Sequence, residues 1–213
     1  MQLTQLEQIY KQNKEHYSDN FRLRIHRSLS WLKQAEQTEE LDFKFIALWV
    51  SFNAAYAQEI DDKLSEKIAF NELIFRICEF DKNQKIYHLI WHTFSGSIRT
   101  LLDNPYIFQP FWDFHNNKIT EQEWLSNFKQ SKKSLQYALS NQDTAKILII
   151  LCQRLYTLRN QILHGSSTFN SSVNRSQVKD ACAILTTLMP LILNIMIDNP
   201  NEIDWGKPFY PVV

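Results

Sequence analysis

An arginine and a histidine with four residues between them are the side chains of this chain best suited to chemistry. Arg159 and His164 stand in residues 159–165 (RNQILHG, the motif below), and Asn160 follows the arginine directly. A guanidinium can hold a phosphate as a planar fork. An imidazole can move a proton near neutral pH. Together these groups are the minimum set for cutting RNA without a metal, and we take RNA cleavage as the first hypothesis.

In that hypothesis a 2′-hydroxyl of the RNA attacks the neighbouring phosphorus, and His164 serves as general base or general acid. Arg159 stabilises the negative charge that develops on the phosphoryl oxygens. Asn160 either orients His164 or hydrogen-bonds the phosphate. The reaction needs no metal or other cofactor and leaves 2′,3′-cyclic phosphate and 5′-hydroxyl ends. DNA cannot react this way because it lacks the 2′-hydroxyl.

Arg159 and His164 do not share a face of a regular helix, because five positions turn a side chain by roughly 140°. In one arrangement the helix ends or loosens near Leu163, as the following Gly165 favours, and the imidazole swings towards the guanidinium. In the other, two copies of the chain face each other and one copy's arginine lies beside the other's histidine. Both arrangements place the motif at a helix end, next to the polar loop 166–174.

A purely structural interpretation competes with the catalytic one. The helix dipole alone favours Arg and His near a helix C-terminus, so Arg159 and His164 could be capping groups of a plain helical scaffold. The context favours catalysis, because an apolar helix, an Arg-Asn pair, a His-Gly pair, a polar loop and a second apolar helix follow one another.

The elements that must position the motif are expected to be helices. Only three Gly and six Pro interrupt the 213 residues, and the apolar periodicity is long, which favours an all-α protein. Helices are expected over residues 4–17, 19–37, 41–60, 64–80, 85–94, from 120, 144–163 and 176–198. Residues 104–117 are expected to form an aromatic-rich turn or short helix, inserted between bundle elements. Residues 199–213 show no periodicity.

Several helix ends carry their own signals. Ser18 or Asp19 can cap the second helix, and Thr120 with Glu123 has the spacing of a capping box. Asp143 or Thr144 begins the motif helix. We expect one domain over residues 1–213, a single up-and-down-like helical bundle with extra N-terminal and aromatic-rich insert elements. Its motif-bearing core lies at about 144–198, and the tail 199–213 is irregular.

Composition narrows the class of partner. Lys and Arg total 23, as do Asp and Glu, so no overall field attracts nucleic acid and any RNA contact must come from a local patch or a dimer groove. Cys78, Cys152 and Cys182 are widely spaced, which favours buried thiols over disulfides or zinc. No signal peptide is visible. The apolar run 181–197 is shorter than the roughly 20 residues of a membrane span. A cytoplasmic protein without membrane contact is expected.

Other groups of chemically capable residues have structural interpretations that we favour. His88 and His92 could clamp a metal, but no third ligand is evident, and we expect no metal site. Two basic clusters are expected to be solvated faces: Arg22, Arg24, His26 and Arg27, and Lys129, Lys132 and Lys133. The aromatic rings of residues 106–114 could stack on bases, but core or dimer packing is the favoured role.

The stretch LYTLRNQILHG (residues 155–165) resembles the Arg-x4–6-His motif of the HEPN superfamily of all-α nucleases. Its Arg-Asn-x-x-x-His-Gly form is most similar to the Apea-like HEPN group. FKFIALWVSFNAAYA (residues 43–57) resembles that group's early core helix less specifically. The resemblance is specific over about residues 144–197 and loose elsewhere. It places the family's Arg and His at Arg159 and His164, and its frequent polar second residue at Asn160.

The resemblance implies a HEPN-type helical bundle and a homodimer whose two motifs share a cleft. It also implies metal-independent endoribonuclease activity in a toxin–antitoxin, abortive-infection or other antiviral system, with an antitoxin or regulatory protein as a further partner. A supporting polar residue from an earlier helix is expected, with Asn53 and Glu59 as candidates. The alternative is a non-catalytic HEPN module that binds RNA, a nucleotide or a protein partner.

Overall fold

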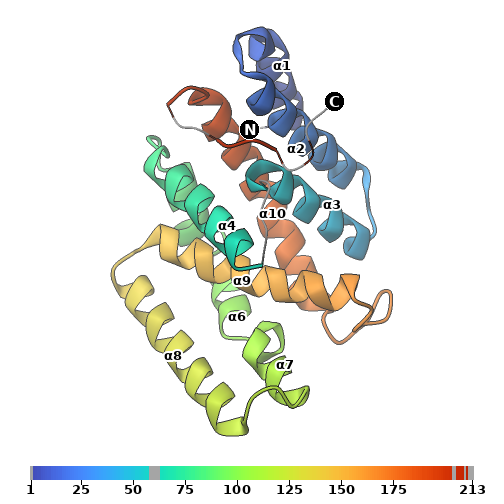
Figure 1. The fold of residues 1–213 in the computed structure, drawn as a ribbon, viewed down its shortest axis with the longest axis vertical. Coiled ribbons are helices and arrows are strands. Elements are labelled where there is room, and N and C mark those ends of the chain that lie inside the picture. Colours follow the sequence, from blue (N-terminus) through green and yellow to red (C-terminus); the bar gives the residue numbers. More distant parts are fainter. Residues whose placement is uncertain (1, 58–62, 203–204, 209, 211–213) are drawn as a thin grey trace. The chain divides into compact units, whose positions relative to one another are not determined.

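The regular structure of the protein is helical throughout the part described. The computed structural model describes residues 2–57, 63–202, 205–208 and 210, with the backbone alone for 63–67. In these residues ten α-helices form and no β-strand does (Figure 1). The expected all-α class is confirmed, while the HEPN-type arrangement of the helices stays a prediction.

The chain folds into two compact units. Unit 1 comprises Met1–Ile86 and Cys182–Val213, and unit 2 comprises Tyr87–Ala181. The motif therefore lies wholly in unit 2. A single domain over residues 1–213 stays a prediction.

Unit 1 is built around a close pair of helices, α2 and α3. Its helices in the first part of the chain are α1 (Leu3–Asn13), α2 (Asp19–Gln37), α3 (Leu41–Tyr56) and α4 (Lys63–Glu79). Ser28 and Ser51 are buried at the α2–α3 contact, and each hydroxyl donates a 2.8 Å hydrogen bond to the other residue's carbonyl. These small side chains bring the two backbones close while keeping their own polar groups paired. The predicted helix over 41–60 ends earlier, at Tyr56, and residues 58–60 lie outside the described part.

Arg24 of α2 is a structural residue of unit 1. Its side chain is fully buried and donates to the carbonyls of Ala54 at 3.2 Å and Gly206 at 3.1 Å. A buried guanidinium is stabilised by such acceptors. The predicted solvated basic face on α2 is therefore wrong for Arg24, because this side chain ties α2 to the end of α3 and to the C-terminal segment.

Unit 2 contains the motif helix and the elements around it. These are the end of α5 (Lys85–His88), the π-turn η2 (Leu89–Thr93), α6 (Ser95–Leu102), the 3-10 turn η3 (Pro105–Ile107), α7 (Gln109–His115), α8 (Glu121–Ser140), α9 (Thr144–Leu163) and the start of α10 (Arg175–Asp198). The helix α6 was not expected. The aromatic-rich segment forms η3 and α7, as a turn and a short helix.

The predicted helix starts of unit 2 are confirmed at their caps. The Thr120 hydroxyl accepts from the Glu123 N–H, and the Glu123 carboxylate accepts from the Thr120 N–H at 2.7 Å, which completes a capping box. The Asp143 carboxylate accepts from the Lys146 N–H at 2.9 Å and caps α9. The motif helix thus begins where its sequence indicated.

Arg154 joins four elements of unit 2. Its side chain is buried and donates to the Leu102 carbonyl at 3.4 Å, at the end of α6, and to the Ser131 hydroxyl of α8 at 3.0 Å. The guanidinium also lies 4.2 Å from the ring centre of Phe108, just after η3. Burial lowers the pKa of Arg154 to about 10, against an opposing effect of Asp103, so the group stays charged at neutral pH. This contact holds α9, the helix that carries the motif, against its neighbours.

The helix α10 is long and apolar enough to cross a membrane by length and composition alone. Most of its apolar window, 72%, is buried inside the structure, which is the usual situation of a core helix. Its individual side chains agree with that role, because Leu188, Met189 and Leu193 are almost completely buried.

Candidate active site

The last turns of α9 present Arg159 and Asn160 together. Both side chains are half-buried, and Nη1 of Arg159 donates a 2.8 Å hydrogen bond to Oδ1 of Asn160. The guanidinium lies 5.8 Å from the ring centre of Tyr156, one turn earlier. Its Nε is shielded from solvent and has no hydrogen-bond partner in the described part of the chain. The guanidinium is thus held in place beside Asn160 and Tyr156.

Gly165 ends α9 in a Schellman motif. It adopts a φ of +68°, a left-handed conformation that glycine accepts without strain. The Gly165 N–H donates to the Ile162 carbonyl at 3.2 Å, and the Ser166 N–H donates to the Gln161 carbonyl at 2.9 Å. The expected helix end near Leu163 is confirmed, and these hydrogen bonds fix where the next side chain, His164, leaves the helix.

His164 is the last residue of this helix end, and its side chain is exposed. Its N–H donates to the Asn160 carbonyl at 3.0 Å. Within the described residues the imidazole makes no hydrogen bond or ion pair, and none joins it to Arg159. The structure therefore brings Arg159 and Asn160 together and leaves the imidazole of His164 in solvent, near the C-terminal carbonyls of the helix.

Exposed apolar side chains flank His164 in the sequence. The exposed fractions are 49% for Leu163, 65% for Phe169 and 84% for Val173. Three exposed apolar residues thus lie within eleven positions of the sequence beside the candidate site.

Gln161, inside the motif, links α9 to the aromatic-rich segment. Its Nε2 donates to the Tyr106 carbonyl at 2.6 Å, and the same carbonyl accepts from Nε1 of Trp112 at 2.7 Å. The segment then packs on α8, with Phe111 5.3 Å from Trp124 between ring centres and Phe108 5.3 Å from Phe128. These aromatic residues contact one another and α8, but none is fully buried, and the Tyr106 side chain remains 55% exposed.

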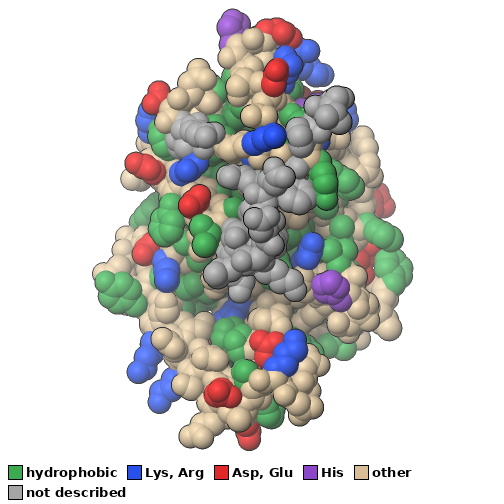
Figure 2. Space-filling view, viewed as in Figure 1, with side chains coloured by type: hydrophobic (Ala, Val, Ile, Leu, Met, Phe, Trp, Pro, Cys, Tyr) green, Lys and Arg blue, Asp and Glu red, His purple; other side chains and the backbone are tan. Residues whose placement is uncertain are grey.

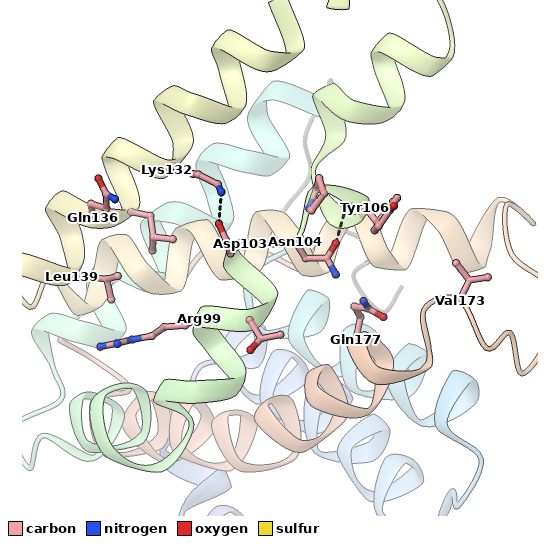
Figure 3. Close-up of a pocket in the computed structure, with 12 residues that line it drawn as sticks. Arg99, Asp103, Asn104, Tyr106, Lys132, Gln136, Leu139, Val173 and Gln177 are labelled. Atoms are coloured by element: carbon pink, nitrogen blue, oxygen red, sulfur yellow. Dashed lines mark hydrogen bonds and ion pairs between the residues drawn. The ribbon is translucent and has the colours of Figure 1, made fainter.

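A groove of about 910 Å³ opens beside this segment, within unit 2. Its walls come from the C-terminal half of α6, from η3, from α8 and from residues 173 and 177. Figure 3 shows Lys132 and Asp103 pointing towards each other, with Arg99 and Gln136 towards one end and Tyr106 and Val173 towards the other. The Lys132 Nζ lies 2.8 Å from Oδ1 of Asp103. One end of the groove therefore reaches Tyr106, the residue that Gln161 of the motif contacts.

Charges of both signs are mixed on the face of the molecule drawn in Figure 2, where lysines and arginines lie among acidic side chains. The equal totals of acidic and basic residues are thus distributed without a large basic field on that face. On α2, Nη2 of Arg22 lies 2.8 Å from Oδ1 of Asp19. This ion pair neutralises part of the basic cluster that the sequence predicted on this helix.

His88 and His92 are both exposed, and their ring centres are 4.9 Å apart. His92 lies in the π-turn η2, in which the Phe94 N–H donates to the Leu89 carbonyl, five residues back. No group of three or more His, Cys, Asp or Glu that could hold a metal occurs in the described part of the chain.

The two candidates for a supporting residue lie outside the motif's unit or outside the described part. Asn53 belongs to α3 of unit 1, where its Oδ1 accepts a 2.7 Å hydrogen bond from the Tyr56 hydroxyl. Glu59 is not among the described residues. Within unit 2, the hydrogen bond between Gln161 of the motif and the Tyr106 carbonyl is a contact that the sequence did not suggest. A polar residue at the third motif position was the only signal for it.

Comparisons with known proteins give the chain no relative. It matches no family model, no curated protein and no solved structure. The case for a function therefore depends on the residues and geometry of the chain itself.

Proposed function

We propose that the protein is a metal-independent endoribonuclease whose catalytic residues are Arg159 and His164. The observation that carries the proposal is the position of Asn160. Its side chain holds the Arg159 guanidinium at 2.8 Å, and its carbonyl accepts the His164 N–H at 3.0 Å. Asn160 thus holds both the Arg159 guanidinium, which would bind the phosphate, and the backbone of His164 at the same helix end.

The proposed reaction moves one proton through His164. The neutral imidazole takes the proton of the RNA 2′-hydroxyl, and the 2′ oxygen forms a bond to the adjacent phosphorus. The bond from phosphorus to the 5′ oxygen breaks, and an imidazolium donates a proton to that leaving oxygen. Arg159 stabilises the extra negative charge on the phosphoryl oxygens. The exposure of His164 supports this role, since the substrate must reach the ring.

A homodimer with a composite site completes the proposal. In the described residues of one chain no hydrogen bond joins the imidazole to Arg159, so a second copy's motif is a way to bring the two groups to one phosphate. The exposed apolar side chains of Leu163, Phe169 and Val173 are suitable material for such an interface. The resemblance to HEPN nucleases further supports a cytoplasmic toxin or antiviral effector, controlled by an antitoxin or another regulatory protein.

The test is cleavage of total cellular RNA in the presence of EDTA. We expect the wild-type protein to cut RNA and leave 2′,3′-cyclic phosphate ends. His164→Ala and Arg159→Ala should each lower the rate about 10²-fold or more, because each removes a group that acts in the transition state. His26→Ala and Arg22→Ala in α2 are matched controls and should cleave normally. Cleavage that survives both motif substitutions would show that the site lies elsewhere.

A non-catalytic module that binds RNA, a nucleotide or a protein is the second candidate. It is favoured by the lack of a hydrogen bond between the His164 imidazole and Arg159 in the described residues, together with the equal totals of acidic and basic residues. A folded, dimeric wild-type protein that binds RNA and never cleaves it would support this candidate and contradict the nuclease.

A further inference from the structure

We infer that the groove of unit 2 binds single-stranded RNA, with phosphates on Arg99 and Lys132 and a base stacked on Tyr106. The inference rests on the proposed function, since it assigns the path by which a substrate reaches the motif. It adds a binding site on α6, η3 and α8, outside residues 159–165.

The cations of the groove are arranged for phosphates. The Arg99 side chain is exposed, and in the described part of the chain no hydrogen bond or ion pair occupies its guanidinium. The Lys132 ammonium lies 2.8 Å from Asp103 and 4.8 Å from the ring centre of Phe128, so it is held over the groove. Arg99, Lys132 and Asp103 are the charged residues among those that line the groove, which gives it a net charge of +1. The chain as a whole has a formal charge of zero, so the groove is a local exception.

Tyr106 offers a platform for a base. Its side chain is 55% exposed, and the Phe111 ring meets it edge-on, 5.4 Å away at an angle of 83°. The neighbouring backbone is fixed, because the Tyr106 N–H donates to Oδ1 of Asn104 at 2.8 Å. An exposed, immobilised ring stacks on an unpaired base, which a single strand provides and a duplex does not. Gln136 and Gln177, which also line the groove, supply amide groups for base edges.

A wall residue of the groove contacts the motif directly. The Tyr106 carbonyl accepts the 2.6 Å hydrogen bond from Gln161, which precedes His164 by three residues. Val173, from the loop that follows the motif, lines the same end of the groove (Figure 3). A strand with its phosphates on Arg99 and Lys132 and a base on Tyr106 would thus lie beside the helix end that carries the motif.

Asp103 makes the inference testable in both directions. Its carboxylate competes with RNA phosphates for Lys132, and its own charge repels them. Replacing it by the isosteric amide, Asp103→Asn, should release Lys132 and raise the net charge of the groove. Damage to the fold would weaken RNA binding, so it cannot explain a gain in RNA affinity in this variant.

The experiment measures fluorescence anisotropy of a labelled 12-nucleotide single-stranded RNA with the full-length His164→Ala protein, so that cleavage does not interfere. Arg99→Gln and Lys132→Gln, each added to it, should weaken binding about tenfold. Each should also reduce the slope of log affinity against log salt by about 0.7. Tyr106→Leu should weaken binding about tenfold, and Tyr106→Phe should retain it. Asp103→Asn should tighten binding several-fold. Lys146→Gln, an exposed cation of unit 2 outside the groove, is the control.

Three results would overturn the inference. They are absence of RNA binding at 50 mM salt, equal binding of a duplex of the same sequence, and groove variants that all bind like the Lys146→Gln control. Because binding is measured without cleavage, the groove can be upheld even if the wild-type protein proves inactive. Conversely, suppose that RNA cleavage requires His164 while every groove variant binds RNA like the control. That result would contradict the RNA-binding groove and leave the proposed nuclease intact.

Discussion

Asn160 shows how one residue can hold both members of the proposed catalytic pair. Asn160 contributes by positioning its neighbours, because its amide carries no charge with which to shift a neighbour's pKa. It holds the arginine through its side chain and the histidine through its backbone. The sequence suggested that Asn160 orients His164 or contacts the phosphate. The structure adds a third partner, Arg159, which a spacing argument could not reveal because adjacent helical residues do not normally face each other.

Gly165 sets the direction in which His164 leaves the helix, so its replacement should affect stability and activity together. Gly165→Ala should lower the free energy of unfolding by about 1 kcal/mol, because alanine is strained at a φ of +68°. Apart from the two chain neighbours, no atom of the described residues lies within 4 Å of the added methyl group, so crowding does not contribute. Urea unfolding measures the loss of stability, and the RNA cleavage assay should show a reduced rate.

Gly96 is the matched control for this substitution. A methyl group added there would also have no atom of the described residues within 4 Å, its chain neighbours and the local helix backbone apart, but Gly96 lies inside α6 without a positive φ. Gly96→Ala should therefore stabilise the protein by about 0.5–1 kcal/mol. Equal effects of the two substitutions would contradict the role assigned to the left-handed conformation.

At the scale of elements, Arg154 illustrates what a sequence pattern hides. It follows Leu151 by three positions and precedes Leu158 by four, so it lies on the apolar stripe of α9. A charged residue on such a stripe indicates a buried and partnered group. The sequence could not identify the partners, because Leu102, Ser131 and Phe108 come from three other segments.

Arg154→Ala should lower the free energy of unfolding by about 3 kcal/mol, because it empties a buried site and leaves the Leu102 carbonyl without its donor. Arg154→Met, which refills the volume, should lose about half as much. Urea unfolding measures both. Arg99→Ala, at an exposed arginine of the same unit, should stay within about 0.5 kcal/mol of wild type. A small effect of Arg154→Ala would show that α9 is held by its apolar contacts alone.

The capping box of α8 predicts a dependence of stability on pH. Hydrogen bonds from the backbone and then the hydroxyl of Thr120 lower the pKa of Glu123 below its usual value of 4.5. The folded state therefore favours the carboxylate. Its contribution to stability is complete above the unfolded pKa and is lost as the pH falls through the lower, folded value.

Glu123→Ala should thus be less stable than wild type at pH 7, and the difference in urea midpoint should narrow at pH 3. Glu121→Ala is the control, because Glu121 is in the same first turn but makes no hydrogen bond to Thr120 in the described structure. A gap between wild type and Glu123→Ala that does not change with pH would contradict the role of the ionised carboxylate.

Helix boundaries were largely predictable because the capping signals are local. Ser18, Thr120, Asp143 and Gly165 act through residues within four positions of themselves. The helix α6 was missed because Ser95, Gly96 and Ser97 have low helix propensity, and its buried Ile98, Leu101 and Leu102 span little more than one turn. The groove was beyond prediction, because its walls come from segments that are distant in the sequence.

At the scale of the whole molecule, the two arrangements of the motif can be separated by mixing inactive variants. Arg159→Ala and His164→Ala proteins are each expected to be inactive. If Arg159 of one copy acts with His164 of the other, subunit exchange should restore about a quarter of the wild-type sites, since half of the dimers are mixed and each has one intact site. RNA cleavage after mixing measures this. A mixture that stays inactive, with exchange verified by labelled subunits, would place both residues in one chain.

The order of the two units along the chain has a consequence for synthesis. Unit 2 is continuous, whereas unit 1 needs both Met1–Ile86 and Cys182–Val213. On the ribosome, all of unit 2 and its motif are therefore made while unit 1 still lacks its final segment, including the Gly206 carbonyl that accepts from Arg24. The part proposed to cut RNA can therefore fold before unit 1, which must wait until Cys182–Val213 has been made.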